Sequence, residues 1–268
     1  MQLTNENYHS LEADRYYMSN SQYKGFLECE AESMAYLRGE WQREHSIAML
    51  VGSYVHAYFE GPEAFELFKA SHPEIISSRG ATKGELKAEF RYANTMIETI
   101  ENDPLCMFVL QGRKEVIMTA EFAGAPWKIK MDCYNVENNR FADIKTTDRI
   151  HKEIWHPGLG YVSFVEAMGY LTQMALYAEI ERLHAGRDGW IEPIIVAVSK
   201  EERPDKAVIG FKAYDIEREL DGIRSNMQRI IEVKSGMVEP TRCERCDYCR
   251  ATKQLNQIVH YTDLIGGR

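Results

Sequence analysis

Two carboxylates and a lysine recur at strand-like spacing in one short stretch of the sequence. Asp143 and Lys145 are two positions apart in a run that alternates between polar and apolar residues, so their side chains point to the same face of a sheet. The pair at positions 138–139, two asparagines, suits a two-residue hairpin turn, which would place Asp132 opposite Lys145. Because cross-strand partners share a face, we expect Asp132, Asp143 and Lys145 to converge on one patch.

This combination of groups suits the metal-assisted hydrolysis of a phosphodiester. Two carboxylates can hold a hard divalent cation, Mg²⁺ or Mn²⁺, through oxygen ligands, and the carbonyl of Ile144 is an additional candidate ligand. The cation lowers the pKa of a bound water, and the lysine orients that water or stabilises developing negative charge. The structural alternative is a solvated hairpin with an ordinary ion pair. Apolar residues on both faces of these strands argue against it, because a covered carboxylate needs a compensating partner.

Two further pairs of residues lie on helices that flank the predicted hairpin. Gly52 and His56 are one turn apart on a helix predicted over residues 46–59. Gln173 and Tyr177 share one face of a later helix. An ordinary core histidine and an ordinary helix–sheet contact are the structural alternatives. Taken in order, the G-x-x-x-H, Asp, D-x-K and Q-x-x-x-Y motifs resemble those of the PD-(D/E)xK nuclease superfamily, particularly its RecB-like branch. The wider chain resembles the RecE-type exonucleases of prophages, which are related in fold to lambda exonuclease.

The resemblance implies a fold and a set of site residues. The fold would be α/β: a restriction-endonuclease-like core with a mixed central sheet flanked by helices, plus a helical N-terminal elaboration. The metal ligands would be His56, Asp132, Asp143 and the Ile144 carbonyl. Lys145 would be catalytic, and Gln173 and Tyr177 would orient the lysine, the water or a DNA phosphate. Glu121 is a weaker candidate for a metal or water contact.

The same resemblance implies an activity and partners. The activity would be a metal-dependent exonuclease that degrades linear double-stranded DNA from its ends, in the 5′-to-3′ direction, during phage or prophage recombination. A single-strand annealing protein would be the partner, and the chain would form a ring-shaped homo-oligomer. Two alternatives remain open. One is a nuclease of repair or CRISPR-adaptation type with another polarity, and the other is a catalytically idle DNA-binding or scaffolding module.

Three cysteines cluster near the C-terminus at the spacing of metal ligands. Cys243, Cys246 and Cys249 offer three thiolates, one fewer than a tetrahedral site requires. Some RecB-like relatives hold a 4Fe–4S cluster with one early and three late cysteines, and this resemblance implies Cys29 as the fourth ligand of a cluster or of a Zn²⁺ ion. A reduced, unoccupied cysteine knuckle is the alternative.

The pattern of the chain predicts one nuclease domain of residues 1–268 in three parts. These are a helical part (1–110), an α/β core (111–235) and the cysteine-bearing tail (236–268). Apolar residues that recur every 3.6 positions predict the helices, and apolar residues at every second position predict the strands. The helices are expected over 19–37, 46–59, 82–102, 161–184 and 215–234, and the strands over 115–122, 127–136, 140–146, 191–198 and 207–214.

Composition limits the classes of protein that this chain can belong to. With 268 residues, 44% of them hydrophobic, the chain can build a sizeable core. Its net charge of −9 argues against a general nucleic-acid binder, so DNA would have to meet a local basic channel. No apolar run approaches the length of a membrane span, and the polar start carries no secretory pattern. We therefore expect a cytoplasmic protein without a membrane partner.

Overall fold

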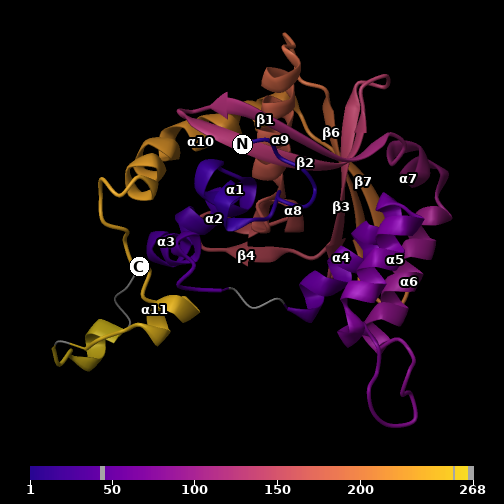
Figure 1. Ribbon diagram of the computed structural model, residues 1–268, viewed down its shortest axis with the longest axis horizontal. Coiled ribbons are helices and arrows are strands. Elements are labelled where there is room, and N and C mark those ends of the chain that lie inside the picture. Colours follow the sequence, from indigo (N-terminus) through magenta and orange to yellow (C-terminus); the bar gives the residue numbers. More distant parts are fainter. Residues whose placement is uncertain (43–45, 256, 265–268) are drawn as a thin grey trace.

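A five-stranded mixed sheet forms the centre of the computed structural model, which describes residues 1–42, 46–255 and 257–264 (Figure 1). The strand order is β1–β2–β3–β6–β7; β3 and β6 run parallel, and the other neighbours run antiparallel. A separate two-stranded hairpin is formed by β4 and β5. The strands are β1 (Arg113–Phe122), β2 (Ala125–Asn135), β3 (Arg140–Thr147), β4 (Ile154–His156), β5 (Gly160–Val162), β6 (Glu192–Ser199) and β7 (Lys206–Gly210). The prediction of a mixed α/β core is confirmed.

Helices cover both faces of this sheet, and a further group precedes it in the chain. The helices are α1 (Leu11–Tyr16), α2 (Asn20–Glu28), α3 (Glu30–Arg38), α4 (Ile47–Glu60), α5 (Pro62–Ser71), α6 (Ala88–Glu101), α7 (Pro104–Val109), α8 (Phe164–Ala167), α9 (Tyr170–Ala185), α10 (Ala213–Lys234) and α11 (Asp247–Ala251), with short 3₁₀ turns at Pro73–Ile75 and Tyr261–Leu264. Within the described part of the chain, no helix is long and apolar enough to cross a bilayer.

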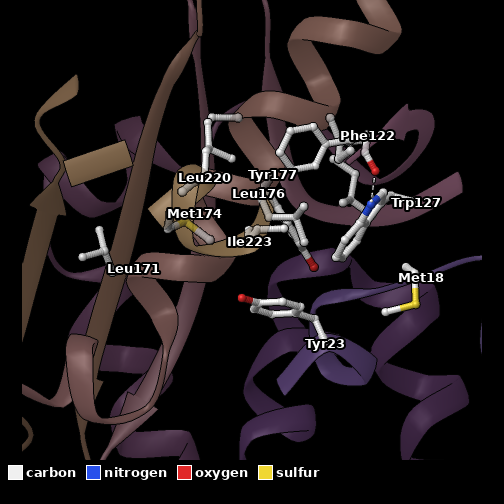
Figure 2. Packing of buried hydrophobic residues seen from close by; sticks show 14 of the residues in the cluster. Met18, Tyr23, Phe122, Trp127, Leu171, Met174, Leu176, Tyr177, Leu220 and Ile223 are labelled. Atoms are coloured by element: carbon white, nitrogen blue, oxygen red, sulfur yellow. Dashed lines mark hydrogen bonds between the residues drawn. The ribbon is translucent and has the colours of Figure 1, made fainter. Parts of the chain in front are cut away.

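The two faces of the sheet bury separate apolar clusters. On one face, α2, α3, α9 and α10 pack over the sheet around Trp127, which is fully buried. Figure 2 shows Trp127 between the N-terminal residues Met18 and Tyr23 and the side chains of α9, with its indole N–H donating to the carbonyl of Phe122 at 2.8 Å. On the other face, α4, α6 and α7 pack over β2, β3 and β6. The sheet is therefore covered on both sides, as expected for a parallel β3–β6 pair joined through a helix.

A buried network of charges attaches the N-terminal segment to the core. Lys128 of β2 is only 2% exposed, and its ammonium donates to the Tyr8 carbonyl and lies 2.7 Å from Asp14 Oδ1. Lys234, at the end of α10, donates to the carbonyls of Asp14 and Tyr17 at 2.9 and 3.0 Å. Both lysines thus contact residues from the first 17 positions, and these contacts attach the N-terminal segment to the core.

The β2–β3 pairing differs from the predicted register by two residues. Tyr134 pairs with Phe141 and Asn135 with Arg140, so the connection is a four-residue turn over positions 136–139. Asn139 adopts a left-handed conformation with φ of 50° within this turn. The expected pairing of Asp132 with Lys145 was therefore wrong. A shift of two residues keeps every side chain on its original face, whereas a shift of one would reverse the faces.

Other boundaries were corrected by local backbone features. The helix predicted over 19–37 is two helices, because Cys29 is extended and caps α3 by accepting from the Glu32 N–H. The helix predicted over 161–184 is two helices, α8 and α9, separated by a left-handed Gly169. Its first two predicted residues belong instead to β5 of the β4–β5 hairpin. The strand predicted over 207–214 ends at Gly210, and the helix predicted over 82–102 begins at Ala88.

Candidate active site

The candidate site lies where β2 and β3 separate. The two strands pair over three residue pairs, from the turn to Cys133–Ala142. Beyond that point the Asp132 carboxylate accepts a hydrogen bond from the backbone N–H of Ile144 at 2.9 Å. This N–H has no backbone partner on β2 once the two strands separate, so the carboxylate satisfies it. Asp132 therefore bridges the diverging strands and is held at the start of the gap between them.

Helix α4 brings the predicted histidine to this gap. His56 Nδ1 lies 3.0 Å from Asp132 Oδ2. Gly52, one turn earlier, allows the close approach, because a Cβ at this position would lie 3.4 Å from Thr146 Oγ1 of β3. The structure thus brings the G-x-x-x-H residues onto the D-x-K strand.

The second carboxylate is buried behind the first. Asp143 is 3% exposed; Lys145 Nζ lies 2.6 Å from its Oδ2, and Gln173 Nε2 donates to its Oδ1 at 2.8 Å. Tyr177 lies deeper, in the apolar cluster drawn in Figure 2, where it contacts the Phe141 ring and shares a hydrogen bond with Gln173. Gln173 thus contacts the carboxylate directly, whereas Tyr177 positions Gln173 from within the core.

The charges of the four groups determine their pKa values. Burial would lower the pKa of His56, but the charge of Asp132 and the hydrogen bond to it outweigh burial and raise that pKa. Burial opposes ionisation of Asp132, yet His56 and Lys145 lower its pKa to about 2. Burial and the Asp132 charge raise the pKa of Asp143. Burial would lower the pKa of Lys145, but the two carboxylates raise it. Asp143 is therefore the carboxyl whose negative charge most needs a nearby cation.

The donor set fits a hard divalent cation. The Asp143 carboxylate is buried, and its Oδ2 has the Lys145 ammonium, 2.6 Å away, as its charged partner. Such a buried oxygen is suited to bind a metal. The imidazole of His56, the carboxylates of Asp132 and Asp143 and the Ile144 carbonyl could hold the ion, as the sequence predicted.

A cleft of about 740 Å³ opens in front of these residues, between α4, the end of β3 and the segment after it. Its lining includes acidic and cationic side chains that were not predicted. Glu60 follows His56 by four positions on α4, and burial together with Glu115 raises its pKa. The Lys145 ammonium lies 4.7 Å from the ring centroid of Tyr170, which precedes Gln173 by three positions. In both cases helical spacing from a motif residue was the signal that could have revealed the neighbour.

Glu121 does not belong to the cleft. It is exposed on β1, near the β1–β2 turn, and pairs with Pro126. Glu115, six positions earlier on the same strand, lines the cleft and forms an ion pair with Lys130. The structure therefore places Glu121 away from the other predicted site residues, because alternation alone does not determine which end of a strand faces a site.

A second group of possible ligands lies at the junction of α3 and the tail. The Sγ atoms of Cys29, Cys243, Cys246 and Cys249 all lie within 4.8 Å of one another. Backbone N–H groups point at the sulfurs: those of Arg245 and Cys246 donate to Cys243 and, against the effect of burial, lower its pKa to about 7. The predicted four-cysteine set is therefore assembled. Figure 1 shows α11, which carries the last of these cysteines, next to α3 and apart from the central sheet.

Comparisons with known proteins agree with this fold. A family described as "PDDEXK-like domain of unknown function (DUF3799)" matches residues 19–252. A solved structure from Eubacterium rectale, described as a "Putative exonuclease", is 41% identical and covers 100% of both chains with a TM-score of 0.93. A second structure, SSO0001, is 12% identical over 85% of this chain and 91% of its own, with a TM-score of 0.25. A comparison with curated proteins gives no match.

Proposed function

The chain belongs to the PDDEXK-like family, and on this premise we propose that it is a metal-dependent exonuclease that hydrolyses DNA phosphodiesters. The observation that carries the proposal is the convergence of Asp132, Asp143 and Lys145 at the point where β2 and β3 separate, beside an open cleft. The 41% identity, over the whole of both chains, to a solved structure described as a "Putative exonuclease" supports the same activity.

Each residue has a role that follows from its contacts. His56, Asp132, Asp143 and the Ile144 carbonyl would hold Mg²⁺ or Mn²⁺, which supplies Lewis-acid polarisation of the phosphate and lowers the pKa of a bound water. Lys145, held as a cation by the carboxylates, would stabilise the negative charge that develops on the phosphate oxygens. Gln173 fixes the orientation of the Asp143 carboxylate through its hydrogen bond to Oδ1.

The finer features of the proposed reaction rest on the resemblance to RecE-type exonucleases. They are a preference for the ends of linear double-stranded DNA, 5′-to-3′ polarity, a role in phage or prophage recombination, a single-strand annealing partner, a homo-oligomeric assembly and a cytoplasmic location. Cationic side chains in the cleft could contact phosphates on a chain of net charge −9, although four carboxylates line the same cleft. The cations are Lys130, Lys145, Arg149, Lys152 and Lys200, and the carboxylates are those of Glu60, Glu115, Asp132 and Asp148.

Digestion of end-labelled linear duplex DNA tests the proposal. We expect Mg²⁺- or Mn²⁺-dependent release of nucleotides from linear DNA, no cleavage of a closed circle, and no activity with EDTA. Lys145→Ala should slow cleavage by about a hundredfold or more while Mn²⁺ binding persists. The matched control is Lys206→Ala, because Lys206 begins β7, is ion-paired with Asp103 before α7, and does not line the cleft. Nicking of the circle would indicate an endonuclease, and an intact linear substrate would indicate an idle binding module.

We also propose that the four-cysteine group holds one Zn²⁺ ion and not a 4Fe–4S cluster. At a Zn–S distance of about 2.3 Å, tetrahedral ligands lie roughly 3.8 Å apart. Two of the Sγ–Sγ distances are 3.5 Å (Cys29–Cys249) and 4.0 Å (Cys243–Cys249), and all are within 4.8 Å. A cluster binds each thiolate to a different iron and therefore spreads the sulfurs farther apart. Purified protein should contain one zinc per chain and lack the broad visible absorbance of an iron–sulfur cluster.

A further inference from the structure

The β4–β5 hairpin presents two large aromatic side chains to solvent. Trp155 and Tyr161 are directly paired across the two strands, and their rings form an edge-to-face contact with centroids 5.3 Å apart. They are 63% and 71% exposed, and Leu159 at the tip is 61% exposed. Trp155 is the one exposed residue among the four tryptophans of the chain. Contiguous exposed apolar surface of this kind is typical of a binding site.

The opposite side of the hairpin fixes it to the core. Ile154 and Val162, which pair with each other, are half-buried, and Ile154 packs against the apolar cluster under α9. Phe164, two residues after β5, is 2% exposed and anchors the returning chain. The alternation of a strand therefore places Trp155 and Tyr161 on the outer face of a ribbon whose inner face is held. Their exposure is a consequence of this geometry and not of an unfolded segment.

The hairpin is continuous with the candidate active site. Ile154, at the start of β4, lines the cleft. Met168, which follows α8, and Tyr170, whose ring lies over the Lys145 ammonium, line it as well. Arg149 and Lys152, in the segment that connects β3 to the hairpin, line the same cleft. A strand of nucleic acid that leaves the cleft along this segment would therefore pass two cations and then reach the hairpin, whose outer face carries the aromatic pair.

We infer that Trp155 and Tyr161 form a stacking platform for unpaired nucleobases of the strand that enters the cleft. This inference rests on the proposed function and specifies its substrate as a strand whose bases are unpaired near the scissile phosphate, as at a frayed or single-stranded end. Aromatic rings stack on any base without regard to sequence, and phosphate contacts alone cannot distinguish strands with and without bases. Stacking on this platform therefore accounts for an exposed aromatic pair beside a cationic cleft.

The test compares two fluorescent oligonucleotides with equal phosphates: a twelve-residue oligothymidylate and an abasic chain of the same length. Binding is followed by anisotropy in EDTA, so that no cleavage occurs, and again with Mn²⁺ in the Lys145→Ala background. We expect wild-type protein to prefer the thymidylate by about tenfold or more, as the loss of one stacked base predicts. The Trp155→Ala/Tyr161→Ala double variant should bind both oligonucleotides with the abasic affinity.

Tyr214→Ala is the matched control, because Tyr214 is 70% exposed on α10 and does not line the cleft. It should keep the wild-type preference. If the double variant fails to fold, Trp155→Phe provides a second measurement: thymidylate should quench wild-type tryptophan fluorescence, and this quenching should disappear in the variant while binding persists. Equal wild-type affinity for the two oligonucleotides would overturn the inference.

A preference that survives in the double variant would also overturn it. If the double variant keeps its base preference but sediments as a smaller assembly than wild type, the inference is also overturned, because the hairpin would then be a contact between copies of the chain. Failure of the proposed function would have a different signature. In that case linear DNA stays intact with wild-type protein, whereas the dependence of base preference on Trp155 and Tyr161 is unaffected, because the binding assay needs no catalysis.

Discussion

Replacing Cys29 with alanine should uncouple metal binding from the stability of the fold. Cys243, Cys246 and Cys249 are close in sequence, so an unfolded chain can still offer three thiolates to zinc. Cys29 is 220 positions from Cys249, and closing a loop of that length costs the unfolded chain about 5 kcal/mol. The fourth ligand is therefore available almost entirely to the folded protein, and it is the ligand that converts zinc affinity into stability.

The size of the effect follows from mass action. A metal that binds only the folded state stabilises it by about 4 kcal/mol when its free concentration is a thousand times its Kd. For a chain of this size, roughly 2–4 °C of melting temperature corresponds to each kcal/mol. We therefore expect a strong zinc chelator to lower the melting temperature of the wild type by about 10 °C. The same chelator should hardly change the melting temperature of Cys29→Ala, even if its three remaining cysteines retain some zinc.

Differential scanning calorimetry with and without chelator, together with metal analysis, measures both quantities. Cys106→Ala is the control, since Cys106 is buried in the cluster beneath α6 and α7, outside the four-cysteine group. It should lower the melting temperature modestly and leave the chelator effect intact. An equal chelator effect in wild type and Cys29→Ala, or none in a zinc-loaded wild type, would refute the reasoning.

Three further substitutions test the candidate active site. Asp132→Asn should lower the pKa of His56, because burial remains while the Asp132 charge that raises this pKa is removed. NMR titration of the ring protons in metal-free protein measures the shift, and an unchanged pKa would contradict the electrostatic account. Gly52→Val should lower the free energy of unfolding by about 1–3 kcal/mol and slow cleavage, because the valine methyls would push α4 away from Thr146. The control, Gly222→Ala on the open side of α10, should stabilise the protein slightly. Denaturant titration measures both. Gln173→Leu should weaken Mn²⁺ binding by about tenfold, as measured by calorimetry, because it removes the donor that orients the Asp143 carboxylate. The control, Gln228→Leu, changes an exposed residue of α10 and should leave Mn²⁺ binding unchanged.

The faces of the hairpin were predictable from the sequence, but its register was not. Asp132, Asp143 and Lys145 converge because the period of two survives a displacement by two residues. The number of residues in the turn depends on the left-handed Asn139, and two adjacent asparagines do not specify which of them adopts that conformation. The G-x-x-x-H and Q-x-x-x-Y motifs placed His56 and Gln173 at the carboxylates, since helical spacing determines which side chains share a face.

Features that depend on tertiary packing were not predictable in the same way. The β4–β5 hairpin has strands of only three residues, too short for a periodic signal, and its apolar residues suggested the start of the following helix. The position of Glu115 in the cleft depends on which end of β1 the tertiary packing brings to the site, which no local pattern encodes. The four-cysteine group was predicted through resemblance, because spacing identified only its last three members.

The buried pair of Lys128 and Asp14 constrains how this sequence can change over generations. Loss of either partner alone leaves an uncompensated buried charge and should cost about 3–5 kcal/mol, whereas replacement of both by apolar residues of similar volume is often neutral. Single substitutions at these positions should therefore be eliminated by selection, and divergent descendants should keep the pair or lose both members together. The two positions are 114 residues apart, so recombination within the gene could separate matched partners. Hybrids that join the N-terminal segment of one lineage to the sheet of another should therefore fold poorly wherever the two lineages differ at this pair.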